Sequence, residues 1–91
     1  MWLEIIELRT VVKNEDMVKV KVRKLIEEVE NEETEQSIRV FSHLTITTDL
    51  SIHLAHSSRI VPASGSPLGL FLVSSLKEYG LVNHSILCEI K

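Results

Sequence analysis

The chain has 91 residues, of which 44% are hydrophobic and 25% are charged, and its formal net charge is -3. A chain of this length makes one small domain that buries roughly 60–65% of its unfolded surface. Aromatic residues make up only 4% of it, so the core must consist of Leu, Ile and Val. The acidic balance gives no electrostatic reason to expect nucleic acid or an anionic membrane as a partner.

The cysteine content and the N-terminal segment indicate a cellular compartment. Cys88 is the one cysteine in the sequence, so no intrachain disulfide can form, which is typical of a reducing compartment. Glu4 and Glu7 interrupt the segment that would be the apolar region of a signal peptide. No run approaches the roughly 20 apolar residues of a membrane helix. These observations predict a cytoplasmic protein.

The first two elements are predicted as a strand and a helix. Residues Trp2–Val12 carry apolar side chains on both faces, which is typical of an interior strand. The next segment alternates briefly like a strand, but over a longer window its apolar residues cluster on one face of a helix. We therefore predict a helix over residues 15–31, with acidic residues in its first turn, followed by an acidic linker over Glu30–Glu35.

The segment Ser37–Ser57 is predicted to form a β-hairpin. Apolar residues alternate along both halves, and matching their apolar faces places Ile46 opposite Leu50. The same register places His43 opposite His53 and leaves a three-residue loop, 47–49. Two opposed histidines would have Cβ atoms about 4.5–5.5 Å apart, close enough to share a ligand, a proton or a metal.

The last two elements are a second helix and a strand. Ser66 is the expected N-cap of the helix, Pro67 its first residue, and Gly80 follows its end. Residues Leu81–Ile90 then read as a strand, with Cys88 on its apolar face as inert packing. The tetrapeptide 64–67 could hold a phosphate or a carboxylate at the helix N-terminus, although plain capping explains it as well.

The order of elements predicts an α+β domain of the ferredoxin-like βαββαβ type, spanning residues 1–91. Right-handed crossovers place the first strand centrally in a four-stranded antiparallel sheet and both helices on one face of it. The other face is then bare. In the predicted register it carries a mixed set of side chains, namely Phe41, His43, Thr45, His53 and Ala55.

In strand order, length and the half-polar sheet face that carries His43 and His53, the whole chain resembles the dimeric α/β-barrel superfamily. In that superfamily two ferredoxin-like subunits stack sheet against sheet; its members include cofactor-independent monooxygenases and haem-degrading enzymes. The resemblance implies a homodimer that binds a small molecule in a cavity between the sheets. No catalytic motif of the family matches residue by residue, so it assigns no catalytic residue.

Three functions remain open at this point. The first is a small-molecule-binding homodimer with candidate ligand-binding residues Phe41, His43, Thr45 and His53. The second is a cofactor-independent oxygenase with His43 or His53 as its base. The third is a ligand-sensing regulatory module, although the loop Val12–Glu15 lacks the glycine that such modules use.

Neither a metal nor a cofactor is predicted. His56 falls on the helix-facing side of its strand, and His84 lies on a strand separated from the hairpin. The alternation therefore does not bring three histidines together as ligands for zinc or iron. Simple hydrogen-bonded histidines at a subunit interface are the remaining interpretation of His43 and His53.

Overall fold

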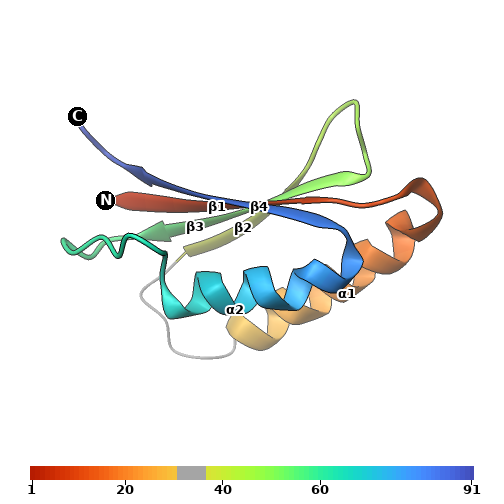
Figure 1. Ribbon diagram of the computed structural model, residues 1–91, viewed down its shortest axis with the longest axis horizontal. Coiled ribbons are helices and arrows are strands. Elements are labelled where there is room, and N and C mark those ends of the chain that lie inside the picture. The colour runs from red at the N-terminus through yellow and green to blue at the C-terminus, as the bar shows by residue number, and fades with distance from the viewer. Residues whose placement is uncertain (31–36) are drawn as a thin grey trace.

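The structure, a computed structural model, describes residues 1–30 and 37–91 and confirms the βαββαβ order (Figure 1). The predicted acidic linker, apart from Glu30, lies outside these residues. Two single-turn 3-10 helices, Val12–Asn14 and Lys77–Tyr79, precede α1 and follow α2. The main elements are β1 (Trp2–Arg9), α1 (Glu15–Glu30), β2 (Ser37–Ser42), β3 (Asp49–His56), α2 (Pro67–Leu76) and β4 (Leu81–Cys88).

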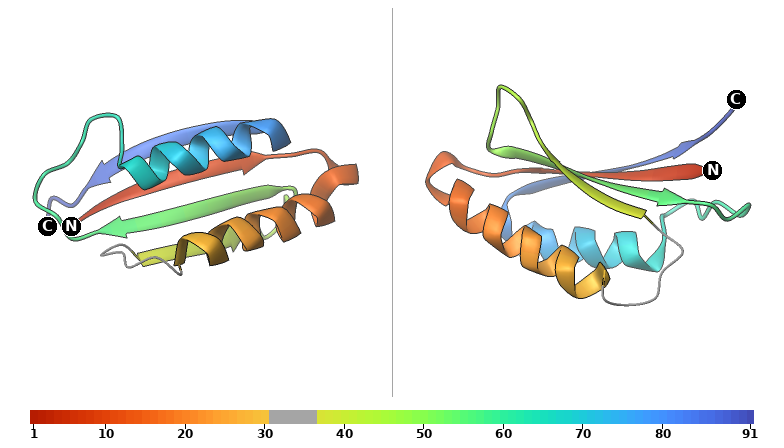
Figure 2. Two further views of the ribbon diagram at one scale, coloured as in Figure 1. Left: turned by 90° about the horizontal axis from the view of Figure 1, so that it is seen from below. Right: turned by 180° about the vertical axis from the view of Figure 1, so that it is seen from behind.

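Within the described residues the strands form one antiparallel sheet in the order β2-β3-β1-β4. Both helices lie on the same side of it, α1 beneath β2 and β3 and α2 beneath β1 and β4 (Figure 2). The predicted ferredoxin-like α+β architecture is therefore confirmed, with β1 in the interior. In β1 the even-numbered side chains are buried under the helices, whereas the odd-numbered ones are partly or fully exposed.

The hydrophobic core fills the space between the sheet and the two helices. Helix α1 ends one residue before the predicted boundary, and it buries Val18, Val22 and Ile26 along one face, as its spacing of three and four residues requires. Helix α2 contributes Leu72 and Leu76, which are fully buried. These side chains pack against the helix-facing residues of the two central strands: Ile6, Leu8, Leu50, Ile52 and Leu54.

Helix α2 begins as predicted. The hydroxyl of Ser66 accepts a hydrogen bond from the amide of Gly69 at 3.0 Å, and Pro67 occupies the first helical position. Gly80 follows the end of the 3-10 turn, but its φ of 162° is extended rather than left-handed. A side chain at this position would collide with the carbonyl of Arg9, so the close approach of two backbone segments requires the glycine.

The predicted register of the hairpin is wrong by four residues. In the structure Val40 pairs with Ile52 and Arg39 pairs with His53, so the strands are joined by a loop over residues 43–48. A shift of four keeps every side chain on the predicted face, because side chains alternate with a period of two. Apolar alternation therefore determined the faces and could not choose between registers that differ by an even number.

The loop itself shows why β2 stops early. The Nδ1 atom of His43 accepts hydrogen bonds from the amides of Thr45 and Ile46, at 3.3 and 3.1 Å. The carbonyl of Ile46 accepts the amide of Asp49 at 2.9 Å, which closes the turn. These bonds satisfy backbone amides and carbonyls of the loop that a longer β2–β3 pairing would otherwise have satisfied. The Leu44 side chain is 91% exposed.

The first and last strands end earlier than predicted, β1 at Arg9 instead of Val12 and β4 two residues before Ile90. Strand β4 ends at Cys88, and the Cys88 side chain is exposed rather than packed in an apolar layer. Cys88 pairs with Trp2 at the end of the β1–β4 ladder. In the described parts of the chain no helix is both long enough and apolar enough to cross a membrane.

Candidate functional site

The sheet face that the helices leave uncovered forms a regular grid of side chains. Strand pairing aligns four residues across the sheet in each row, one from each strand. The two rows toward the N-terminal end of β1 are Ser37, Ala55, Leu3 and Leu87, then Arg39, His53, Ile5 and Ser85. The next rows are Phe41, Ser51, Glu7 and Asn83, then Asp49, Arg9 and Leu81, with His43 beyond Asp49 in the hairpin loop.

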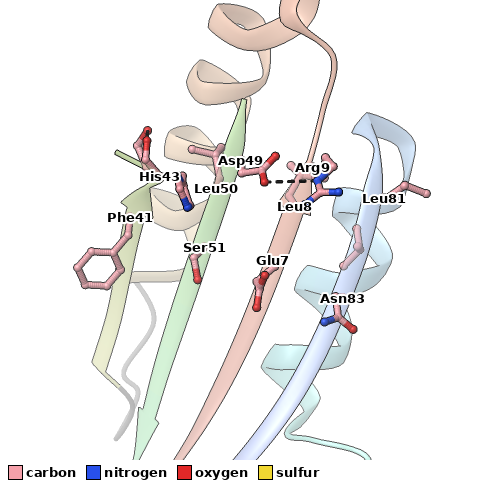
Figure 3. A pocket seen from close by; sticks show the side chains of 12 residues that line it. Glu7, Leu8, Arg9, Phe41, His43, Asp49, Leu50, Ser51, Leu81 and Asn83 are labelled. Carbon is pink, nitrogen blue, oxygen red and sulfur yellow. Dashed lines mark hydrogen bonds and ion pairs between the residues drawn. The ribbon is translucent and has the colours of Figure 1, made fainter. Parts of the chain in front are cut away.

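The two ends of this open face differ in chemistry. The row with Leu3, Ala55 and Leu87 is mainly apolar, and Ile5 lies in the row beside it. The opposite end carries charged and amide groups, and there the surface is hollowed into a cavity of about 550 Å³ (Figure 3). This volume lies within the range of small-molecule sites, roughly 300–1,000 Å³.

Seven of the twelve residues that line the cavity are polar or charged, although apolar atoms make up the larger part of its surface. Phe41 lies on the β2 side and Leu81 on the β4 side, with Ser51, Glu7 and Asn83 between them (Figure 3). Apolar surface beside a few hydrogen-bonding groups is the usual composition of a pocket that binds a small organic molecule.

The charges that line the cavity partly cancel. The Nε atom of Arg9 donates to Oδ2 of Asp49 at 3.4 Å, across the β1–β3 pair. With Glu7 added, the lining carries two carboxylates and one guanidinium. A ligand anion would meet a negative surface overall, so the lining disfavours an anion.

Of the four predicted ligand-binding residues, the structure brings Phe41 and His53 together. Their rings lie on neighbouring strands with centroids 4.7 Å apart. Nε2 of His53 shares a hydrogen bond with the hydroxyl of Ser51 at 2.9 Å. Phe41 lines the cavity, and His53 lies in the adjacent row of the same face.

The other two predicted residues lie in the hairpin loop. His43 borders the cavity but does not face His53, since the partner of His53 across the hairpin is Arg39. Its Nδ1 atom is already hydrogen-bonded to loop amides. Thr45 is exposed beside His43, with its hydroxyl 3.4 Å from Nδ1. The predicted shared histidine pair is therefore absent, and the structure assigns His43 a role in holding the loop.

The sequence did not predict a second polar cluster, which lies on the helix-facing side. The carboxylate of Glu4 is fully buried at the centre of the sheet. Its Oε1 is 2.7 Å from Nε2 of His56, and its Oε2 is 2.8 Å from Nε2 of His84. Because an ionised carboxylate only accepts hydrogen bonds, both imidazoles donate from Nε2.

The same carboxylate occupies the N-terminus of α2. The amide of Ser66 donates to Oε1 of Glu4 at 3.0 Å. Plain capping, the favoured interpretation of residues 64–67, is confirmed by the Ser66 side chain, and the same helix N-terminus also holds the Glu4 carboxylate of the same chain. Burial by itself would raise the pKa of Glu4, but the hydrogen bonds from Ser66, His84 and His56 outweigh it and lower the pKa below its ordinary value.

Two glycines make room for this carboxylate. A side chain at Gly69 would collide with the carboxylate of Glu4. At Gly65 a Cβ would stand 2.5 Å from Cε1 of His84 and 2.7 Å from Oε2 of Glu4, and its φ of +99° is the left-handed conformation that glycine adopts most easily. The loop and the first turn of α2 are therefore shaped around a buried anion.

His56 is held from a second side by an aromatic contact. The Trp2 ring stacks on the His56 ring with centroids 3.9 Å apart and planes inclined by 17°. The indole Nε1 of Trp2 donates to the hydroxyl of Ser58 at 3.0 Å. The cluster therefore joins β1, β3, β4 and the start of α2 through polar contacts in an otherwise apolar layer.

One signal in the sequence could have indicated this cluster. Glu4 has the same parity as Ile6 and Leu8 in β1, so it must face the helices with them. A carboxylate in that position needs donors, and His56 was already expected on the helix-facing side. The pairing of β4 with β1, which brings His84 diagonally to Glu4, was needed to complete the set.

In residues 1–30 and 37–91, no group of three or more His, Cys, Asp and Glu side chains is arranged to hold a metal ion. Comparison of the chain with protein-family models, with curated proteins and with solved structures finds no match. The function must therefore be argued from the geometry of the open face and of the buried cluster.

Proposed function

We propose that the protein is a homodimer that binds an uncharged, amphipathic small molecule between two open sheet faces. The observation that carries this proposal is the cavity of about 550 Å³ at the polar end of the open face. Its apolar surface, its hydrogen-bonding groups and the net negative charge of its lining suit a ligand with an apolar body, a few polar atoms and no negative charge.

The apolar end of the same face supports the second half of the proposal. Leu3, Ile5 and Ala55 are only half-buried in the single chain, and Leu87 at the sheet edge is 48% exposed. A second copy related by a two-fold axis would cover these side chains and would also roof the cavity. The ferredoxin-like fold is compatible with the stacking of the dimeric α/β-barrel superfamily, whose arrangement this proposal adopts.

Binding can be tested with 2-naphthol as the probe, followed by amide shifts in ¹⁵N-correlated NMR spectra. We expect saturable shifts confined to the cavity residues, with the largest at Ser51 and Asn83, because these side chains offer hydrogen bonds beside the apolar walls. The anion 2-naphthoate, which has the same ring system, should bind more weakly because Glu7 and Asp49 repel it. Absence of saturation, or shifts spread over both faces of the sheet, would contradict the proposal.

Pairing of the open faces can be tested separately with Leu87→Glu. Leu87 is exposed in the single chain, so the substitution should leave the fold intact and place a buried charge in the dimer. Sedimentation equilibrium should then show half the mass of the wild type. Leu70→Glu on α2 is the matched control, since Leu70 has a similar exposure of 46% and lies on the other side of the molecule. Equal masses for both variants would refute pairing through the open face.

A further inference from the structure

Strand β2 is an edge of the sheet, and half of its backbone hydrogen-bonding groups point away from β3. The amide of His43 donates to the carbonyl of Asp49 at 3.0 Å, which identifies this pair as a hydrogen-bonded one. Such pairs alternate with non-bonded ones along an antiparallel ladder. The N–H and C=O groups of Ile38, Val40 and Ser42 therefore point outward.

This edge carries only some of the features that prevent strands from pairing, namely its short length and the charged side chain of Arg39. The β2 sequence SIRVFS contains no proline and no lysine, and its register with β3 is continuous, without a bulge. Natural edge strands commonly use such features to avoid association with another chain. The Val40 side chain, 40% exposed, also faces the helix layer and adds apolar surface beside the open edge.

A groove lies next to this edge, between β2 and α1. It has a volume of about 450 Å³, and its apolar part is formed by Val22, Ile26, Leu50 and Val40. The side chains of a strand added to β2 would alternate with the same parity as those of β2. Every second side chain would therefore point into this groove.

The charges along the groove are self-complementary. Lys19 and Arg23 line one end of it and Glu27 and Glu30 line the other, all on α1. A two-fold axis perpendicular to the sheet would set two copies of α1 antiparallel. Arg23 of one copy would then face Glu27 of the other, since this pair is centred near the middle of the helix, whereas Lys19 is already paired with Glu15 of its own helix at 2.8 Å.

We infer that the β2 edge is a second interface, at which another copy of this chain pairs β2 with β2 in antiparallel orientation. Pairing centred on Val40 sets Ile38 of one copy opposite Ser42 of the other. All three outward-facing residues then find backbone partners. The groove is filled by the apolar side chains of the second strand, and the two α1 helices bring their opposite charges together.

The decisive variant is Val40→Pro. The amide of Val40 points outward, so its loss leaves the β2–β3 ladder complete, and proline is tolerated at such edge positions. It removes both hydrogen bonds of the central Val40 pair in the proposed pairing and places a ring in the groove. We expect sedimentation equilibrium to show half the mass of the wild type, with an unchanged circular dichroism spectrum. Val40→Thr, which keeps the amide and the branched side chain, is the control and should retain the wild-type mass.

A charge experiment tests the same interface without changing the strand. Arg23→Glu and Glu27→Lys each place like charges opposite one another, and each should weaken association about tenfold. When the two variants are mixed, the substituted side chain of one chain faces the oppositely charged substituted side chain of the other, and association should return to the wild-type level. Failure of the mixture to associate more tightly than either variant alone would overturn the inference, even if Val40→Pro failed to fold.

The outcomes separate this interface from pairing of the open faces. If both contacts form, the wild type assembles beyond a dimer, Val40→Pro and Leu87→Glu are dimers, and the double variant is a monomer. A dimeric wild type that becomes a monomer with Val40→Pro supports the edge interface alone. An unchanged mass for a folded Val40→Pro variant overturns the edge interface. This holds whether the edge is unoccupied or pairs with an extended peptide from another protein.

Discussion

Glu4 is the residue on which the polar chemistry of the helix-facing layer depends. Its carboxylate accepts three hydrogen bonds, from His56, His84 and the amide of Ser66, and is fully buried. Removing such an acceptor leaves donors without partners in an apolar layer, which costs more than the bonds contributed. The cluster therefore stabilises one specific arrangement of the sheet and α2.

The substitution Glu4→Gln should lower the free energy of unfolding at pH 7 by about 1–3 kcal/mol, because an amide nitrogen would face one of the donors. The lowered pKa of Glu4 sets the sign of the pH dependence. Its stabilisation is complete above the ordinary glutamate pKa, about 4.3, and is lost as the pH falls through the lower folded value. The difference between wild type and variant, measured by urea unfolding, should shrink accordingly below about pH 4.

Glu7→Gln on the same strand is the control for this experiment. Glu7 is exposed on the open face, and its substitution should change the free energy of unfolding by less than about 0.5 kcal/mol. Equal effects of the two substitutions at pH 7 would show that the buried hydrogen bonds of Glu4 contribute no stability.

Helix α2 is positioned by its close approach to β1. Gly69 lies against the Glu4 carboxylate, where no side chain fits. In the helix Pro67–Leu76 this glycine is unfavourable by its propensity alone, so its presence is explained by packing.

Gly69→Ala should therefore destabilise the protein, by about 1–3 kcal/mol, although the same change in an open helix is stabilising. Thermal and urea unfolding measure the effect. Ser74→Ala, at an exposed position of the same helix, is the control and should stabilise slightly or have no effect. An increase in stability with Gly69→Ala would mean that α2 can move away from β1 without loss.

The loop over residues 43–48 depends on His43 in a similar way. We expect His43→Ala to accelerate hydrogen exchange of the Thr45 and Ile46 amides, since Nδ1 is their acceptor. Global stability should change by less than about 1 kcal/mol because His43 is exposed. His53→Ala should leave both amides unaffected. Exchange rates that do not respond to His43→Ala would remove its role in holding the loop.

The sheet separates two kinds of surface. The helix side holds the core and the buried cluster, and the open side holds an apolar end and a cavity. The proposed open-face contact and the proposed edge contact use different parts of the subunit. Each can therefore be removed without the other.

The order of the elements and the faces of the strands could be predicted from local sequence patterns. Periods of 3.6 and 2 are properties of local backbone geometry, so they can be read from α1 and from the hairpin without knowing what each element packs against. The cap of α2 at Ser66 and Pro67 is local in the same sense.

The register of the hairpin and the hydrogen-bond partners of Glu4 are seen only in the tertiary structure. Alternation is unchanged by an even shift of register, and in the observed register His43 accepts hydrogen bonds from the loop amides. The cluster joins residues 4, 56 and 84, which are adjacent because β1 lies between β3 and β4. Contacts between distant segments depend on how the strands are ordered and aligned, and no local pattern in the chain records that alignment.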